Sequence, residues 1–376
     1  MAKKVLLFSK ESRGGIQTFL NNLSKLGDSD FEMQLFLFKK DRLFYNKTNI
    51  PTTYLGKSYP STSEFSFKKV QKYLRHIIKT IFLILKEKPN IVCCIDTYSM
   101  LIILPIRLFW KSLHVVSIIH SHFPKTLYEK RGLIYKNILF YWYSRLIIWS
   151  TFIVFVSYGS RREYLEKFKI DYKKTRVIYD GIKLPIKKPV EIKALRLSQL
   201  KPLKVFSMGR FEKQKDFATI IKAVSLLSKR YPIELFLIGE GILKTRLKSL
   251  AKKTSITTKV HFLNWKLNIY RYLRKAHVFV FSSYYETFGL TILEALICGI
   301  PVVATDTEYG PSEILNRGEY GILVPVKNYK KMARAIEKLI LDKKLRKEFS
   351  TGGFNRAKQF SNSIMLEKYR KLFISL

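Results

Sequence analysis

Short, mainly apolar runs alternate with amphipathic segments along the whole chain. The runs stand at 5–8, 31–38, 91–95, 115–119, 152–156, 205–208, 233–238, 260–263 and 278–281. Such runs are typical of strands that are buried on both faces of a parallel sheet. Several segments between them carry apolar residues at every third or fourth position, which predicts helices. The alternation therefore predicts an α/β fold with parallel sheets.

The length of 376 residues fits about two domains. We expect a first domain over residues 1–182 and a second over residues 204–360. Residues 183–203 contain Lys and Pro without clear periodicity, and we expect them to be a linker. Helices are predicted at 16–26, 65–85, 161–168, 329–341 and 345–360, with a last one within 361–376.

The stretch from Ser282 to Ala295 joins the strand at 278–281 to a helix. Helical spacing of apolar residues begins after Gly289, so Glu286 and Gly289 should lie on a strand-to-helix turn. That turn would be at the carboxyl edge of the sheet, where open α/β folds bind ligands. Gly289 lets a ligand approach the backbone closely, and the free N–H groups after it suit a phosphate.

Two carboxylates, Glu286 and Glu294, lie beside this expected anion site. A site for phosphate alone would avoid them, because like charges disfavour one another. They fit a ligand that carries hydroxyl groups as well as phosphate, such as a nucleotide sugar. In the structural alternative, Glu286 complements the helix dipole and Glu294 lies on a solvated face.

Other strand ends carry residues suited to the same ligand. Arg210 and Lys215 follow one strand, and arginine can bind a phosphate with two N–H groups while lysine adds a charge. His120 directly follows another strand, and Gly15 and Gly239 lie in glycine turns after two more. The alternatives are surface cations of a basic chain, a loop histidine without a role, and ordinary turns.

The segment Glu-Thr-Phe-Gly-Leu-Thr-Ile-Leu-Glu-Ala at 286–295 resembles the paired-glutamate signature of retaining GT-B glycosyltransferases. The resemblance is to the large group 1, or family 4, type, which includes bacterial capsule, O-antigen and lipid-glycan transferases. Residues 299–305, 310–314 and 321–325 are also similar to this family, in its order and spacing. The resemblance implies two Rossmann-like domains facing across a cleft, with the last helix crossing back to the first domain.

The resemblance also implies roles for single residues. Catalytic roles fall to Glu286 and His120, donor diphosphate binding to Arg210, Lys215, Gly289, Leu290 and Gly15, ribose and sugar binding to Glu294, Phe288 and Thr291, and the nucleobase side to Gly239 and Trp265. The chain departs from the family pattern at two places. Gln17 and Thr18 stand where an acidic residue usually follows the glycine pair, and Asp180 stands where Asn is usual.

The reaction implied is transfer of a hexose or N-acetylhexosamine, with retention, from a nucleotide-diphosphate sugar. The donor is expected to be a UDP-sugar, and the acceptor a hydroxyl of a lipid-linked glycan or surface-polysaccharide precursor. No cofactor and no metal are expected, because cations and a helix dipole can stabilise the leaving diphosphate. Asp306-Thr307-Glu308 imitates a metal-binding Asp-x-Asp pair, and we attribute this to chance.

The chain is strongly basic, with 69 Lys and Arg against 28 Asp and Glu and a net charge of +41. This excess implies an anionic partner surface or substrate. We expect a cytoplasmic enzyme, peripheral at the inner face of the cytoplasmic membrane, since three cysteines without metal spacing favour a reducing compartment. A basic nucleic-acid-binding protein and a non-catalytic GT-B protein are the alternatives, but no nucleic-acid motif accompanies the charge.

Two segments bear on membrane contact. In the helix predicted at 65–85, we expect the apolar stripe Phe67, Val70, Leu74, Ile77, Ile81 and Leu85 to pack on the sheet. Its lysines would then face lipid headgroups. Residues 138–156 are long enough for a membrane span, but we expect a helix over about 133–149 followed by a strand.

Overall fold

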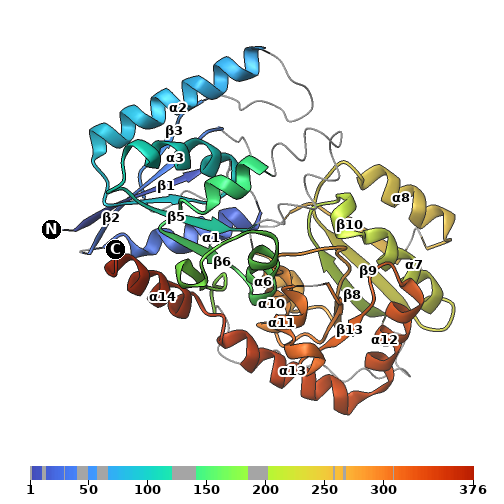
Figure 1. The fold of residues 1–376 in the computed structure, drawn as a ribbon. Coiled ribbons are helices and arrows are strands. Elements are labelled where there is room, and N and C mark those ends of the chain that lie inside the picture. Colours follow the sequence, from blue (N-terminus) through green and yellow to red (C-terminus); the bar gives the residue numbers. More distant parts are fainter. Residues whose placement is uncertain are drawn as a thin grey trace. The chain divides into compact units, whose positions relative to one another are not determined.

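The computed structural model describes residues 2–10, 14–28, 30–39, 50–56, 67–120, 141–184, 202–256, 259–265, 268–307 and 309–376. The chain forms two compact units, Met1–Gly181 with Asn362–Leu376, and Ile182–Ser361. Figure 1 shows that each unit is a central sheet with helices on both faces. Each unit is therefore a Rossmann-like α/β domain, as the alternating pattern predicts.

The first unit contains a seven-stranded sheet in the order β3-β2-β1-β4-β5-β6-β7. Its strands are β1 (Lys3–Ser9), β2 (Phe31–Leu37), β3 (Thr52–Tyr54), β4 (Ile91–Cys94), β5 (His114–Ile119), β6 (Phe152–Phe155) and β7 (Thr175–Val177). Every neighbouring pair is parallel. The inner strands are continuously apolar because both faces of the sheet are covered.

Helices cover the two faces of this sheet unequally (Figure 1). One face is covered by α1 (Gly15–Leu23), η1 (Ser24–Leu26) and α14 (Asn362–Ile374). The other is covered by α2 (Phe67–Glu87), α3 (Thr97–Phe109), a helix at 141–147, and α6 (Tyr158–Lys167). The short η2 (Tyr172–Lys174) precedes β7. The last helix of the chain is thus part of the core of the first unit.

The second unit contains a six-stranded parallel sheet in the order β10-β9-β8-β11-β12-β13. Its strands are β8 (Leu203–Met208), β9 (Ile233–Ile238), β10 (Val260–Leu263), β11 (Val278–Phe281), β12 (Val302–Thr305) and β13 (Ile322–Val324). Its helices are η3 (Lys213–Lys215), α7 (Phe217–Leu227), α8 (Lys244–Lys253), α9 (Tyr270–Leu273), α10 (Leu290–Leu296), α11 (Pro311–Ile314), η5 (Asn316–Gly318), α12 (Tyr329–Leu341) and α13 (Lys343–Lys358). One face is covered by α7, α8 and α12, while α10 packs against α13 on the other.

A buried asparagine of α1 holds both places where the chain passes between the units. The side-chain amide of Asn22 donates to the carbonyl of Gly181 at 2.9 Å, and Asn362 donates to the Asn22 Oδ1 at 2.6 Å. Next to them the N–H of Ile182 donates to the carbonyl of Phe360 at 2.8 Å. Gly181 and Asn362 are therefore fixed to α1 within the first unit, and Ile182 is paired with Phe360 within the second.

Most predicted elements are present within one to three residues of the expected bounds, but several were missed. β3 lies in a segment expected to be irregular, and α3 and α8 were not predicted. α6 begins at Tyr158 because Ser157 caps its first turn. The expected linker falls mostly on residues 185–201, and the expected helix at 133–149 partly on residues 121–140, which lie outside the described residues.

The expected packing of α2 is wrong. Leu74, Ile81 and Leu85 of its supposed inward stripe are 51%, 38% and 53% exposed. The polar residues His76 and Thr80 face the core instead, and both are buried. They are tolerated there because Nδ1 of His76 hydrogen-bonds the Tyr98 hydroxyl at 2.7 Å and Thr80 donates to the His76 carbonyl at 2.7 Å.

Membrane spanning was also considered for the apolar segment at 138–156. Within the described part of the chain, no helix has the length and apolar character needed to cross a bilayer. Residues 152–155 of that segment form β6, as expected.

The place of α14 in the core of the first unit gives a prediction. Phe373 is fully buried against Phe31 and Tyr369, so Phe373→Ala is expected to lower the free energy of unfolding of this unit by about 3–5 kcal/mol. The adjacent Ile374 is 57% exposed, and Ile374→Ala is expected to change it by less than about 0.5 kcal/mol. Native-state hydrogen exchange of the β1 and β2 amides measures both. Equal effects of the two substitutions would contradict this packing.

Candidate active site

Glycine turns at the carboxyl edge of the second sheet bring loop backbones into close contact. A Cβ on Gly239 would overlap the carbonyl oxygen of Gly209, and one on Gly241 would lie 2.6 Å from the carbonyl oxygen of Phe211. Both glycines have φ angles near +153°, which side chains rarely adopt. The loops after β8 and β9 are therefore locked together, with further hydrogen bonds from Gly209 N–H to the Ile238 carbonyl and from Phe211 N–H to that of Glu240.

The locked loop after β8 carries Lys215, which forms an ion pair with Glu286 from the loop after β11. The two side chains are only 18% and 13% exposed. The ammonium also lies 5.4 Å from the centroid of the Phe281 ring. The structure thus brings together two of the residues singled out in the sequence, 71 positions apart.

Two residues without a predicted role hold this pair in place. The Ser282 hydroxyl donates to the carbonyls of Lys215 and Asp216 at 2.7 and 3.0 Å. The side-chain amide of Gln214 donates to the Tyr285 carbonyl at 2.9 Å, and the Tyr284 N–H donates to the Gln214 carbonyl at 2.8 Å. In the sequence, the one indication of the role of Ser282 is that it directly follows a strand.

Gly289 begins α10, as the sequence predicts, with φ 116° and ψ 52°. Gly289, the N-cap residue, has no side chain with which to accept from the N–H groups of the first turn. The hydroxyl of Thr291 in that turn is buried and has no hydrogen-bond partner among the described residues. Gly310 packs tightly against the loop before α10, because a Cβ there would overlap the Phe288 carbonyl. An anionic or hydroxyl-bearing ligand would satisfy the unpaired groups.

Glu294 lies about one turn further along α10. Burial raises the pKa of its carboxyl to about 7. No hydrogen bond or ion pair reaches this carboxyl from the part of the chain that the structure describes. Burial also raises the pKa of Tyr270, and the nearby Glu294 adds to that effect. The Glu294 side chain is half-buried, which lies between the two environments considered for it.

Other predicted residues of the second unit are placed differently. Arg210 is 56% exposed and pairs with Glu212 at 3.1 Å, away from Lys215. The Phe288 side chain is buried against Phe360, with ring centroids 5.8 Å apart, so the ring is part of the core and does not face a ligand. Trp265 is 47% exposed, beside residues outside the described range.

The first unit places His120 at the carboxyl end of β5, as predicted. Its Nε2 hydrogen-bonds Oδ1 of Asp180 at 3.0 Å, and both side chains are less than a tenth exposed. The imidazole also packs on Phe19 of α1 at 4.4 Å between ring centroids. Gly15 is the first residue of α1. His122, the other histidine of this loop, lies outside the described residues.

Metal-binding groups were looked for in the same regions. The described residues contain no cluster of three His, Cys, Asp or Glu side chains that could hold a metal ion. Asp306 is exposed after β12, and Glu308 lies outside the described range.

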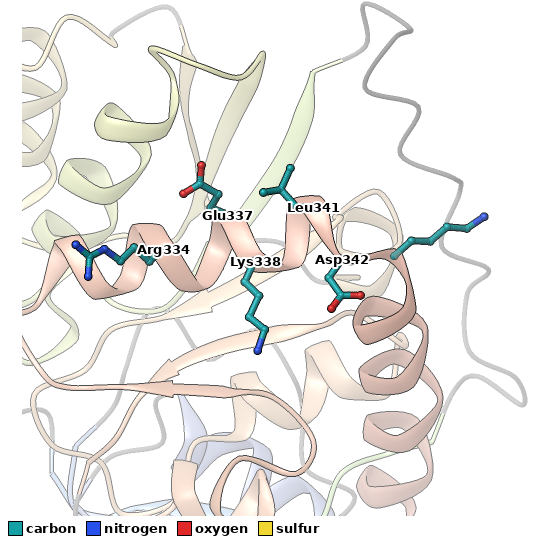
Figure 2. Close-up of a pocket in the computed structure, with 6 residues that line it drawn as sticks. Arg334, Glu337, Lys338, Leu341 and Asp342 are labelled. Atoms are coloured by element: carbon teal, nitrogen blue, oxygen red, sulfur yellow. The ribbon is translucent and has the colours of Figure 1, made fainter.

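A surface hollow of about 630 Å³ lies elsewhere on the second unit. It is lined by Arg334, Glu337, Lys338, Leu341, Asp342 and Lys343, at the carboxyl end of α12 (Figure 2). Because α12 follows β13 and packs back along the sheet, this end lies at the amino edge, opposite the glycine turns. Figure 2 shows the labelled side chains pointing in different directions. The hollow is therefore separate from the candidate site and offers no convergent set of polar groups.

Two family models match the chain. The model described as Glycosyltransferase Family 4 matches residues 13–184, and the one described as Glycosyl transferases group 1 matches residues 191–356. Together they cover most of both units.

Individual relatives agree with these models. The chain is 29% identical over 359 residues, 92% of each protein, to an N-acetylgalactosamine-N,N'-diacetylbacillosaminyl-diphospho-undecaprenol 4-alpha-N-acetylgalactosaminyltransferase of Campylobacter jejuni. It is 36% identical over 172 residues to the lipopolysaccharide core biosynthesis glycosyltransferase LpsE of Rhizobium meliloti, which is 46% of this chain and 49% of that protein.

Solved structures are similar over nearly the whole chain. HepE of Anabaena in complex with UDP-glucose has a TM-score of 0.82 at 18% identity, covering 99% of this chain and 100% of that one. Sucrose-phosphate synthase from Thermosynechococcus elongatus has a TM-score of 0.80 at 20% identity, covering 100% of both chains. At these identities the similarity bears on the fold alone, and it confirms the predicted pair of Rossmann-like domains.

The environment of Glu294 predicts a stability cost that depends on pH. Its folded pKa, about 7, lies above the unfolded value of about 4.5, so folding loses stability as pH rises between these values. Glu294→Gln removes this loss and is expected to raise the free energy of unfolding of the second unit by roughly 1–3 kcal/mol at pH 8. The gain should shrink toward pH 4.5. Urea unfolding at several pH values measures it, and a pH-independent difference would contradict a raised pKa for the Glu294 carboxyl.

The His120–Asp180 pair gives a second prediction for this site. Asp180→Ala leaves the buried ring nitrogen without its acceptor and is expected to cost the first unit about 1–3 kcal/mol. Asp180→Asn keeps an oxygen acceptor and should cost less than about 1 kcal/mol. Hydrogen exchange of the β5 amides compares the two. If Asn were as damaging as Ala, the negative charge rather than the hydrogen bond would be what His120 requires.

Proposed function

Because the chain belongs to the group 1 glycosyltransferases of family 4, with their GT-B fold, we propose a specific transfer reaction for it. The donor is a UDP-sugar that carries a hexose or an N-acetylhexosamine. The acceptor is a hydroxyl group of a lipid-linked glycan or surface-polysaccharide precursor. The sugar keeps its anomeric configuration, and the reaction needs no metal.

The observation that carries this proposal is the Lys215–Glu286 ion pair beside the uncapped first turn of α10. A donor diphosphate competes with Glu286 for the Lys215 ammonium. Glu286 is then free to accept a hydrogen bond from a hydroxyl of the donor sugar. One pair thus supplies a cation for the phosphates and a carboxylate for the sugar.

The chemical need at this site is to stabilise a leaving group. As the bond between the anomeric carbon and the phosphate oxygen breaks, its electron pair and a negative charge pass to UDP. Lys215 and the N–H groups of Gly289 and Leu290 are held before the reaction begins, so they stabilise that charge without reorganising. A single preorganised donor of this kind contributes about 3–4 kcal/mol in other enzymes. Arg210 joins them if it leaves Glu212.

Glu294 and Thr291 suit the ribose and sugar hydroxyls. A carboxyl whose pKa burial has raised to about 7 gains most from a ligand that donates hydrogen bonds to its ionised form. The buried Thr291 hydroxyl gains a partner from the same ligand. Donor binding should therefore offset the cost of burying both groups.

Retention is proposed to follow from attack on the face that the leaving group departs from. The acceptor oxygen bonds to the anomeric carbon while its proton passes to the leaving phosphate oxygen, so that atoms and charge balance. We propose that His120, which is held by Asp180, hydrogen-bonds a donor hydroxyl or the acceptor. Trapping a covalent glycosyl-enzyme intermediate would contradict this pathway.

The acceptor class is supported by the relatives and by charge. The Campylobacter jejuni relative is named for a diphospho-undecaprenol acceptor, and the Rhizobium meliloti relative for lipopolysaccharide core biosynthesis. A net charge of +41 favours an acceptor that carries a diphosphate and lies in an anionic membrane. We therefore propose that the enzyme works peripherally at the inner face of the cytoplasmic membrane.

The donor part is tested by release of UDP from a panel of nucleotide sugars in the presence of EDTA. We expect turnover of one UDP-sugar, and a loss of about 10²–10³-fold in Lys215→Ala and Glu286→Gln. Lys213→Ala removes an exposed cation from the same η3 turn and should change turnover less than about twofold. Calorimetry with UDP separates binding from turnover. If no nucleotide sugar binds or reacts, or if EDTA abolishes turnover, the proposal fails in its donor or its metal-independent part.

A further inference from the structure

The outer face of α2 exposes a continuous apolar stripe. Leu74, Ile78, Ile81, Phe82 and Leu85 recur every three or four residues, so they lie on one side of the helix. They are 38–65% exposed, with Ile78 and Phe82 at 65%. An apolar stripe of this length facing water is costly in a monomer and marks an interaction surface.

The inner face of α2 is fixed, so the stripe is held outward. Ile84 is buried in the core, and the Tyr73 hydroxyl donates to the Leu101 carbonyl of α3 at 2.7 Å. His76 is bonded to Tyr98, and burial, with Lys72 and Lys79 adding to it, lowers the pKa of His76 to about 4. The helix cannot turn its apolar stripe inward without breaking these contacts.

One flank of the stripe is basic. Arg75, Lys79 and Lys86 follow the apolar positions around the helix, between the exposed stripe and the buried face, and Lys79 also donates to the Leu55 carbonyl at 2.9 Å. The only acidic residue of α2 is Glu87, and its carboxylate is paired with Lys4. The exposed side of this helix therefore combines apolar side chains with an uncompensated row of positive charge.

Neighbouring helices on the same face of the first sheet also expose large apolar side chains. Phe109, the last residue of α3, is 93% exposed, and α3 packs beside α2 (Figure 1). Tyr141 and Trp142, on the helix at 141–147, are 53% and 56% exposed. That helix packs on α3, where the Tyr143 hydroxyl contacts the Met100 sulfur at 3.5 Å. Amphipathic aromatic side chains are typical of the boundary between apolar chains and water.

We propose that the outer face of α2 is the surface with which this protein binds an anionic lipid bilayer. The apolar stripe enters the boundary of headgroups and acyl chains, and Arg75 and Lys86 contact lipid phosphates. A second copy of the chain fits less well, because a symmetric contact would bring the two basic rows together. A nucleic acid would satisfy the cations but leave the apolar stripe in water.

This inference rests on the proposed function in one respect, which is that a lipid-linked acceptor requires the enzyme at a membrane surface. The surface itself can be tested without the transfer reaction. Vesicle binding measures the surface, and UDP release from a soluble nucleotide sugar measures the donor site. Failure of one is therefore distinguishable from failure of the other.

The experiment is co-sedimentation of the full chain with vesicles of phosphatidylcholine alone, or with about 30% phosphatidylglycerol. The test variant is Ile78→Ser with Phe82→Ser, and the charge variant is Arg75→Gln with Lys86→Gln. The matched control is Ile242→Ser with Leu341→Ser, which removes two exposed apolar side chains, 88% and 60% exposed, from the second unit. All substitutions fall on exposed side chains, and UDP release without vesicles reports that each variant is folded.

Wild type and the control are expected to bind the anionic vesicles equally. The Ile78→Ser, Phe82→Ser variant should partition at least about tenfold more weakly, with unchanged UDP release in solution. The charge variant should lose binding mainly to anionic vesicles, and salt should weaken wild-type binding. Equal binding by the test variant would overturn the proposal, as would equal wild-type binding to both kinds of vesicle. A lipid-free dimer that the test variant dissociates would assign the surface to a second copy instead.

Discussion

The candidate site depends on the close approach of loop backbones at the carboxyl edge of the second sheet. Gly239 and Gly241 leave no space between the loops after β8 and β9, and Gly310 leaves none against Phe288. These contacts fix the loop that carries Lys215 and the loop that carries Glu286. Two opposite charges can then remain paired at low exposure, where the weak screening by water makes them effective toward a ligand.

The same rigidity leaves some polar groups without partners. Among the described residues the buried Thr291 hydroxyl has no partner, and the half-buried Glu294 carboxyl has a raised pKa. A fold optimised for stability alone would hydrogen-bond or remove such groups. We interpret them as groups whose hydrogen-bond partners are supplied by a bound ligand, so that binding satisfies polar groups that folding alone leaves without partners. The candidate site therefore combines polar groups that lack hydrogen-bond partners among the described residues with the Lys215–Glu286 ion pair.

The sequence predicts those parts of the fold that are set by local pattern. Continuous apolar runs give the inner strands, and Gly289 gives the start of α10. α3 was missed because it is apolar on all sides and contains Pro105, so no helical period is visible. The roles of Asn22, Asp180 and Gln214 depend on partners 60 to 159 positions away, which no local pattern encodes. The packing of α2 was predicted wrongly because His76, which is hydrogen-bonded to Tyr98, occupies a core position that the pattern assigns to an apolar residue.

The outward-facing apolar stripe of α2 and the positive charge of the chain both point to a membrane surface, where the proposed acceptor would lie. The donor site balances its cation with Glu286, so it does not account for an excess of 41 positive charges. A helix that buries polar residues and exposes Ile78 and Phe82 would be selected against in a protein that meets only water. Binding to an anionic membrane would explain both the excess of positive charge and the exposed apolar side chains of α2. An acceptor anchored in that surface would also be concentrated near the enzyme, which raises the encounter rate without any new contact at the site.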